Sequence, residues 1–430
     1  MESLDRSNIK KILLTTTGLS SVGQGGGISS YVHDLATNFV NKGYKVTVYL
    51  VRQSEPVFPT ASVYDYSFFQ IPNKRCDESV LVSEIYKSIL ALNPDVIINN
   101  DVSYIAGLWP VLDTKIIRIS VMHGFKEGFT WSNFGIQGKM AIYNWKYIDY
   151  IVCQNEAMVT DASKKYHIPE QKFCCIHQTV NFVPIQKLEK SSFSILFAGG
   201  ASYSKGADIA YNVAKELKNT SLNFEFHWCL PAGKYEKYFE SDRRFVFHGA
   251  LSRESFLQTL GNSDCILIPT RMDTGPLLLV EALAQGVIPL CNDVKSAIPD
   301  LIKSGKNGFI VKKNRVREYL RIIEDLSKKN IVSISDLAKE SYQKTLTPEC
   351  QVLSFEQLFR KNTSLMQRSF SSQNIVHFHL YNTALYHKVS YVRILNKVIN
   401  AFEIVMTDRL YKNCFTLIPQ HYYKIFFLST

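Results

Sequence analysis

The chain alternates short β-rich runs with amphipathic helical stretches, and it completes this cycle twice. The first cycle runs from an apolar strand at residues 10–18, through a glycine-rich loop, to a helix over residues 28–43. The second cycle begins with a strand at residues 193–200 and a helix over residues 205–219. Strand, turn, helix and strand in this order predict parallel sheets with right-handed crossovers. We therefore expect an α/β protein with two facing Rossmann-like domains.

The length of 430 residues exceeds what a single ordinary core organises. The apolar pattern lapses near residues 178–192, which places the joint between the domains there. The prediction is a first domain over residues 1–185 and a second over 186–350, followed by a C-terminal extension over 351–430. Two facing α/β domains form a cleft at the carboxyl ends of their strands, where ligands bind in such sheets.

The C-terminal extension has a different composition from the rest of the chain. From residue 371 onward it is aromatic and basic, and its apolar residues between 392 and 402 follow helical spacing. Two interpretations stay open. One is a partly helical segment that packs on the body of the protein, and the other is a contact with a membrane surface or a second chain.

The whole chain carries 49 basic and 38 acidic residues, a formal net charge of +11. Such a charge suits nucleic acid, an anionic membrane surface or anionic substrates. Because no nucleic-acid-binding motif is present, only the last two remain. We find no apolar run of about 18 residues and no secretory signal, so we expect a cytoplasmic protein with possible peripheral attachment to the inner membrane face.

The nine cysteines are scattered, and none forms a CxxC pair. Free thiols in a reducing compartment explain this usage better than a disulfide framework or a zinc site.

The segment from residue 265 to 286 predicts an anion-binding site. Residues 265–270 are typical of a buried strand, and a short helix follows that Gly286 ends. We expect Gly275 to cap this helix and Pro276 to be its first residue. The backbone N–H groups that follow, from Leu277 onward, lack partners within the helix, and the helix dipole adds partial positive charge. A diphosphate fits this position.

Two acids accompany the same helix. Glu281 lies in an apolar stretch, where an ionised carboxylate is costly unless it is hydrogen-bonded. A ribose diol would supply two donors, and the alternative is a pairing with a nearby lysine or a backbone amide. Asp273 precedes the helix and would reach the sugar end of a bound ligand.

These residues resemble a known family. Asp273 and Glu281 are separated by seven residues, and the run "EALAQGVIPLCND" follows, then "SGKNGFIV" over residues 304–311. This pattern resembles the retaining glycosyltransferases with the GT-B fold, and the likeness extends over roughly residues 10–350. It implies a hexosyl-type glycosyltransferase that moves a sugar from a nucleotide-sugar donor to a glycan or lipid-linked acceptor, as in polysaccharide biosynthesis. The chain contains no Asp-x-Asp triplet, in line with the metal independence that the resemblance implies.

The resemblance also implies a set of site residues. Lys205 and Gly206 match a phosphate-binding motif, and the lysine would stabilise the charge of the leaving diphosphate. Gly26 and Gly27 belong to the glycine loop at the cleft, where Ile28 stands in place of the last glycine of a dinucleotide fingerprint. His123 follows a strand and would position the donor sugar with Asp273. The expected catalytic residues are Asp273, His123 and Lys205, and the expected donor-binding residues are Gly26, Gly27, Gly206, Gly275, Pro276, Leu277 and Glu281.

Three positions depart from the family pattern. Gly200 stands where the family has an arginine, Asp273 is one methylene shorter than the usual glutamate, and residues 177–181 replace an Asn-Gly stretch. Two other functions therefore stay open. One is a binding subunit that has kept the fold and lost catalysis, and the other is a sugar-nucleotide epimerase on the same fold.

Overall fold

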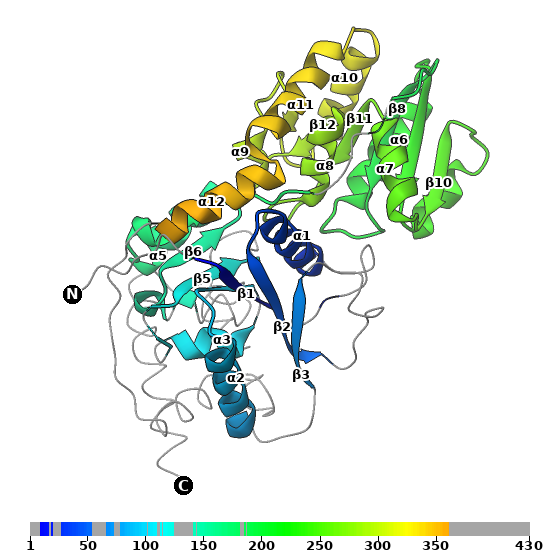
Figure 1. Ribbon diagram of the computed structural model, residues 1–430. Helices are drawn as coiled ribbons and strands as arrows, with labels where there is room; N and C mark the ends of the chain where they lie inside the picture. Colours follow the sequence, from blue (N-terminus) through cyan, green and yellow to red (C-terminus); the bar gives the residue numbers. More distant parts are fainter. Residues whose placement is uncertain are drawn as a thin grey trace, which may run out of the picture.

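The structure is a computed structural model of the chain (Figure 1). It describes residues 9–16, 19, 27–53, 66–72, 78–100, 102–109, 112, 113, 115–123, 141, 142, 144–180, 185 and 187–360. The predicted extension beyond residue 360 and the loop residue Gly26 lie outside these ranges.

The first domain is built on a parallel sheet of seven strands. The strand order is β3-β2-β1-β4-β5-β6-β7, in which the chain reverses direction across the sheet between β1 and β4. The strands are β1 (Lys11–Thr16), β2 (Lys45–Gln53), β3 (Ser67–Pro72), β4 (Val96–Asn99), β5 (Ile117–Met122), β6 (Tyr150–Cys153) and β7 (Phe173–Cys175). Every neighbouring pair is parallel, as the sequence predicts.

Helices cover this sheet because its central strands are apolar on both faces. All six residues of β5 and all four of β4 are buried. Leu13 packs in one hydrophobic cluster while its neighbours Ile12 and Leu14 pack in another, as the alternation of side chains along a strand requires. The helical elements of this domain are α1 (Gly27–Asn41), α2 (Glu78–Leu92), α3 (Ser103–Leu108) and α5 (Glu156–Tyr166), with short 3₁₀ turns at Trp145–Tyr147 and Glu170–Lys172.

The second domain contains a parallel sheet of six strands in the order β10-β9-β8-β11-β12-β13, the Rossmann order. The strands are β8 (Phe193–Ala198), β9 (Phe224–Cys229), β10 (Phe245–Gly249), β11 (Cys265–Ile268), β12 (Ile288–Asn292) and β13 (Phe309–Val311). The helical elements are α6 (Ala207–Lys218), a 3₁₀ segment at Gly233–Phe239, α7 (Arg253–Gly261), α8 (Leu277–Gln285), α9 (Ile298–Leu301), α10 (Val316–Ser327) and α11 (Val332–Thr345). The prediction of two Rossmann-like α/β domains is confirmed.

The last described helix, α12 (Pro348–Arg360), returns to the first domain. It runs from α11 of the second domain to α1 of the first (Figure 1). Phe355 and Phe359 pack on Phe39 of α1, with ring centroids 5.8 and 6.0 Å apart. The start of the predicted extension, residues 351–360, thus completes the core of the first domain. The domain boundaries at 185 and 350 stay predictions.

Among the residues that the structure describes, no helix is long and apolar enough to cross a bilayer.

Candidate functional site

The site forms where the second sheet reverses its strand order. Strands β8 and β11 are neighbours there, and the chain leaves their carboxyl ends in opposite directions, to α6 and to α8. Such a switch point opens a crevice between two loops and is the usual ligand position in an open parallel sheet. The two loops are residues 199–206, which contain Lys205, and residues 269–276, which contain Asp273.

Backbone contacts hold the two loops together. The Arg271 amide donates to the Ser204 carbonyl at 2.8 Å, and the Thr270 hydroxyl reaches the same oxygen at 3.1 Å. Gly206 has a φ of +74°, and a Cβ at this position would lie 2.0 Å from the carbonyl oxygen of Pro269. Only glycine accepts both the conformation and the close approach. Gly206 therefore makes the junction of the loops possible, which is a structural reason for the motif that we expected to bind phosphate.

Lys205 and Asp273 meet across this junction. The Lys205 Nζ atom lies 2.7 Å from Asp273 Oδ2, with 53% of the lysine side chain exposed and 14% of the aspartate. The long exposed stem of the lysine allows it to turn toward an incoming anion.

Arg271 binds across to the neighbouring loop and to α6. Its guanidinium binds both carboxylate oxygens of Asp208 at 2.7 Å and lies 3.9 Å from the centroid of the Tyr203 ring. The ion pair with Asp208 raises the pKa of Arg271. This bidentate contact positions the loop, and it leaves the arginine no second face for a diphosphate.

The helix start differs by one residue from the prediction. Pro276 is the N-cap residue, with φ −66° and ψ 116°, and α8 begins at Leu277. The Pro276 carbonyl accepts the first helical hydrogen bond, from the Leu279 amide at 2.9 Å. No side chain caps the helix, and the amides of its first turn have no partner within the helix itself. Gly286 ends the helix in the left-handed conformation, as predicted.

Glu281 is buried and forms an ion pair with Arg253, the first residue of α7. Burial raises the pKa of Glu281, and the positive charge of Arg253 opposes that rise. The pairing that we weighed against a ribose contact is therefore present, although its partner is an arginine rather than a lysine or an amide.

Asp34 of α1 brings a second carboxylate to the same arginine from the other domain. Burial raises the pKa of Asp34 to about 7, with Arg253 lowering it and Glu281 raising it further. Arg253 and Asp34 carry no motif of their own, and sequence analysis missed both. Only the approach of α1 to α7 and α8 reveals them.

On the first domain, His123 sits at the carboxyl end of β5, as predicted. Its Nε2 atom lies 3.0 Å from Asn100 Oδ1, and its Nδ1 atom lies 2.8 Å from Gln154 Nε2. Asn100 can only accept here, because its amide group donates to the Thr15 carbonyl. The ring is therefore the Nε2–H tautomer. Burial lowers the pKa of His123 to about 3, which keeps the ring neutral at physiological pH.

The two domains meet at Thr274. Its carbonyl oxygen accepts from Asn155 Nδ2 at 2.7 Å, and its hydroxyl lies 3.2 Å from both the His123 carbonyl oxygen and Gln154 Oε1. A Cβ on Gly275 would make ordinary contact at 3.7 Å with both Gln154 of the first domain and Ala297 of the second, so this glycine lies between the domains. The loop before α8 thus joins the carboxyl edge of the first sheet to that of the second.

The structure brings most of the predicted residues to one place. Lys205, Asp273 and the start of α8 share the edge of the second sheet, and Thr274 links that edge to His123. Gly27 is exposed as the first residue of α1, and a Cβ there would meet nothing within 4 Å. The contacts of Gln154 and Asn100 were not foreseen. The only sequence signal for them is a polar side chain directly after a buried strand.

Two family models match the chain in succession. The model of the Glycosyltransferase Family 4 covers residues 25–182, and the model described as Glycosyl transferases group 1 covers residues 181–344. The first match corresponds to the seven-stranded domain and the second to the six-stranded domain with its candidate site.

Curated relatives and solved structures resemble the chain more distantly. The putative colanic acid biosynthesis glycosyltransferase WcaL of Salmonella typhimurium is 27% identical over 141 residues, which are 28% of this chain and 34% of the relative. The chain spans between 34% and 42% of the length of the first three curated relatives that it matches.

Two solved structures share the fold. A mutant of TarM from S. aureus, in complex with Fondaparinux, alpha-GlcNAc-glycerol and UDP, matches with a TM-score of 0.64 and 12% identity over 82% of this chain and 100% of its own. Anabaena HepE in complex with UDP-glucose matches with a TM-score of 0.59 and 14% identity over 81% of this chain and 99% of its own. The two family models follow one another over both domains, and with this fold they place the chain among the GT-B glycosyltransferases, in the families Glycosyltransferase Family 4 and Glycosyl transferases group 1.

Proposed function

We propose that this protein transfers a hexose from a nucleotide-sugar to an acceptor with retention of configuration. The observation that carries the proposal is the junction of Lys205 and Asp273 beside the uncapped start of α8, at the edge that meets the first domain. A cation, free helix amides and a carboxylate are the groups that a diphosphate linked to a sugar requires.

Each group has a place in the proposed reaction. The amides of Leu277 and Leu278 would receive the diphosphate, and Lys205 would turn from Asp273 to the same phosphates. As the bond to the sugar breaks, negative charge grows on the leaving diphosphate, and a fixed cation stabilises it without a metal. Asp273 and the neutral ring of His123 would hold the sugar, while the leaving phosphate accepts the proton of the acceptor hydroxyl on the same face.

Glu281 is proposed to reach the ribose with Arg253 as its partner. A carboxylate that is already paired with arginine keeps its charge when a ligand excludes water, and it still has one oxygen to accept from a hydroxyl. The TarM structure named above contains UDP and the HepE structure contains UDP-glucose, which makes a UDP-sugar the first donor to test.

The acceptor is proposed to be a glycan or a lipid-linked glycan, held by the first domain at the cytoplasmic face of a membrane. The net charge of +11 supports an anionic surface or an anionic lipid carrier. Co-sedimentation with vesicles that contain anionic lipid, at low and at high salt, tests this part alone.

The donor experiment uses the purified chain and a panel of nucleotide-sugars. Thermal-shift titration with UDP, GDP and ADP identifies the base, and mass spectrometry of donor hydrolysis and of transfer to added glycans identifies the sugar. We expect a stabilising shift with one nucleotide and a new glycosidic product whose anomeric configuration matches that of the donor. An isomerised donor with no glycosidic bond would instead mean an epimerase.

A binding subunit without catalysis is the second candidate, and Gly200 favours it, because the loop after β8 lacks the arginine of the family pattern. If the chain binds a nucleotide but neither hydrolyses nor transfers any donor of the panel, it is a binding subunit and not a transferase.

A further inference from the structure

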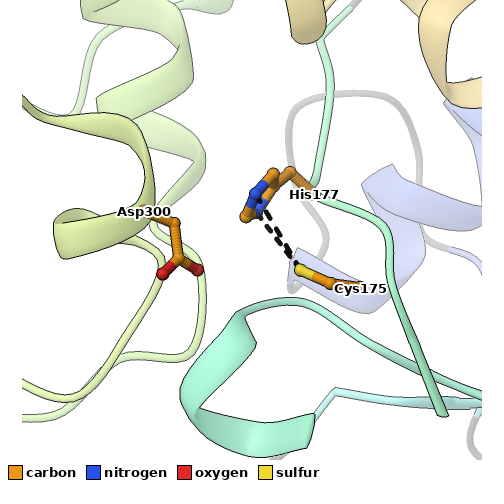
Figure 2. A group of neighbouring side chains, drawn as sticks. All are labelled: Cys175, His177 and Asp300. Carbon is orange, nitrogen blue, oxygen red and sulfur yellow. Dashed lines mark hydrogen bonds between the residues drawn. The ribbon is translucent and has the colours of Figure 1, made fainter.

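A cysteine, a histidine and an aspartate meet at a second point between the domains (Figure 2). Cys175 ends β7, His177 follows it in the segment that leads toward the second domain, and Asp300 belongs to α9 of the second domain. One ligand atom from each side chain lies within 4.8 Å of the other two. The described residues contain no other group of this kind. Sequence spacing does not reveal it, because the third member lies far along the chain.

The histidine is oriented in the way that metal-binding histidines are. Its Nδ1 atom lies 3.0 Å from the backbone carbonyl oxygen of Gln154, which selects the tautomer with the proton on Nδ1. The lone pair then resides on Nε2, and the Cys175 sulfur lies beside the ring, 3.9 Å from Nε2 and 4.0 Å from Nδ1. A carbonyl behind the ring makes the imidazole a better ligand and holds it in place.

The aspartate is oriented as well. Its Oδ2 atom accepts a hydrogen bond from the Glu156 amide at 2.9 Å, a contact that crosses the domain boundary. Glu156 adds its own carboxylate near the Cys175 thiol. Asp300 is exposed, so an ion has a path to this position.

We propose that Cys175, His177 and Asp300 bind a zinc ion that ties the two domains together. Sulfur, nitrogen and oxygen ligands in one site favour zinc, because magnesium and calcium prefer oxygen alone. The thiol gives its proton to solvent as the zinc–sulfur bond forms. The neutral imidazole and the ionised carboxylate bind without further proton loss, and water completes four ligands. The donor atoms must approach one another by about 1 Å to reach ordinary zinc geometry, a shift within the rotamer freedom of an exposed aspartate.

The proposed zinc site lies next to the candidate donor site and does not overlap it. Gln154 touches both, since its backbone carbonyl orients His177 while its side chain reaches His123 and Thr274. The ion would restrain the angle between the domains at the side where the chain crosses over, and the donor site would stay free of metal. This proposal does not depend on the proposed transferase activity.

Cobalt(II) provides the test, because cobalt bound to a thiolate absorbs in the near ultraviolet and, when tetrahedral, in the visible. The purified, reduced chain is stripped with a chelator, titrated with cobalt and then displaced with zinc. We expect one cobalt per chain, a thiolate charge-transfer band and loss of the colour when zinc is added. The variants Cys175→Ser, His177→Gln and Asp300→Asn should each lower zinc affinity by at least ~10-fold.

Cys174→Ser is the matched control. Cys174 is the neighbouring thiol on the same strand, and it packs against the opposite face of the sheet from Cys175. Circular dichroism and thermal melting after metal removal show whether each variant folds. Zinc should raise the melting temperature of the wild type and of Cys174→Ser, and it should leave that of Asp300→Asn unchanged. A wild type without the charge-transfer band, a band that survives in Cys175→Ser, or full affinity in Asp300→Asn would overturn the proposal.

Discussion

The ammonium group of Lys205 lies 2.7 Å from the carboxylate of Asp273, and this pair closes the gap between the loops that leave β8 and β11. Both residues belong to the proposed catalytic group, so in the structure without ligand they neutralise each other. A donor diphosphate would compete with Asp273 for the lysine, and the freed carboxylate would then face the sugar. Donor binding and the position of Asp273 are therefore linked, because the diphosphate and Asp273 compete for the same ammonium group of Lys205.

Replacing Lys205 with alanine should lower turnover by about 10²–10³-fold, because a charge that stabilises the leaving group is lost. The free energy of unfolding should change by less than about 1 kcal/mol, because the lysine side chain is largely exposed and water screens its ion pair. Steady-state transfer kinetics and thermal melting measure the two effects. Lys187→Ala is the control, because Lys187 forms a similar pair with Asp264 at 2.8 Å at the opposite edge of the same sheet. Wild-type turnover in Lys205→Ala would contradict the phosphate role.

Adding an arginine at position 200 should strengthen donor binding. A Cβ at Gly200 meets nothing within 4 Å, and its φ lies outside the left-handed region, so the side chain can be accommodated. An arginine there would add a charge-assisted contact to the diphosphate. We expect Gly200→Arg to lower KM for the donor about 5- to 10-fold, with Gly200→Ala as the neutral control. An unchanged KM in a folded variant would show that this position does not face the phosphates.

Glycine at position 206 should be required for folding of the second domain. Gly206→Ala places a methyl group 2.0 Å from the Pro269 carbonyl oxygen in a left-handed conformation. We expect a loss of at least about 2 kcal/mol in the free energy of unfolding, measured by urea denaturation. Gly200→Ala, on the same loop, should stay within about 0.5 kcal/mol of the wild type. Equal stability of the two variants would mean that the loops separate easily.

Removal of Arg253 should lower the free energy of unfolding mainly because it leaves the buried carboxylate of Glu281 without a counter-charge. Arg253→Met leaves a buried carboxylate without its partner and should cost about 1–3 kcal/mol. The double variant Arg253→Met with Glu281→Gln should recover part of that loss, because the neutral amide needs no counter-charge. A double-mutant cycle by urea denaturation measures the coupling energy between Arg253 and Glu281. If the losses of the two single variants simply add, the two side chains do not stabilise each other.

Stability should depend on pH through Asp34. Its folded pKa of about 7 exceeds the ordinary value near 4, so the folded state binds a proton that the unfolded state has already released. Asp34 therefore lowers stability as pH rises from about 4 to 7, and the penalty is complete above 7. Asp34→Asn should be more stable than the wild type at pH 8 by on the order of 1 kcal/mol, and the difference should vanish near pH 4. Denaturation at several pH values tests this, and a constant difference would contradict it.

The sequence was sufficient for the fold because its information is local. Three local signals carried it: continuous apolar runs such as β11, glycine at helix ends such as Gly43 and Gly286, and the twofold cycle of strand and helix. Each depends on a few neighbouring residues. The sequence analysis did not single out β3 or β7, and β7 has only three residues, too few to carry a pattern. The helix start was misplaced by one residue because Pro276 can serve as cap or as first helical residue.

The sequence by itself determined the two sheets, the short helix that contains Glu281 and the lysine in the loop after β8, since each is encoded within one loop and the element that follows. Tertiary structure alone decided which charges meet. Asp34 and Arg253 come to Glu281, Lys205 to Asp273, and Asp300 to Cys175 and His177, from segments that are far apart in the chain. Coulombic attraction and desolvation depend on distance in space, and only the packing of one domain on the other sets those distances.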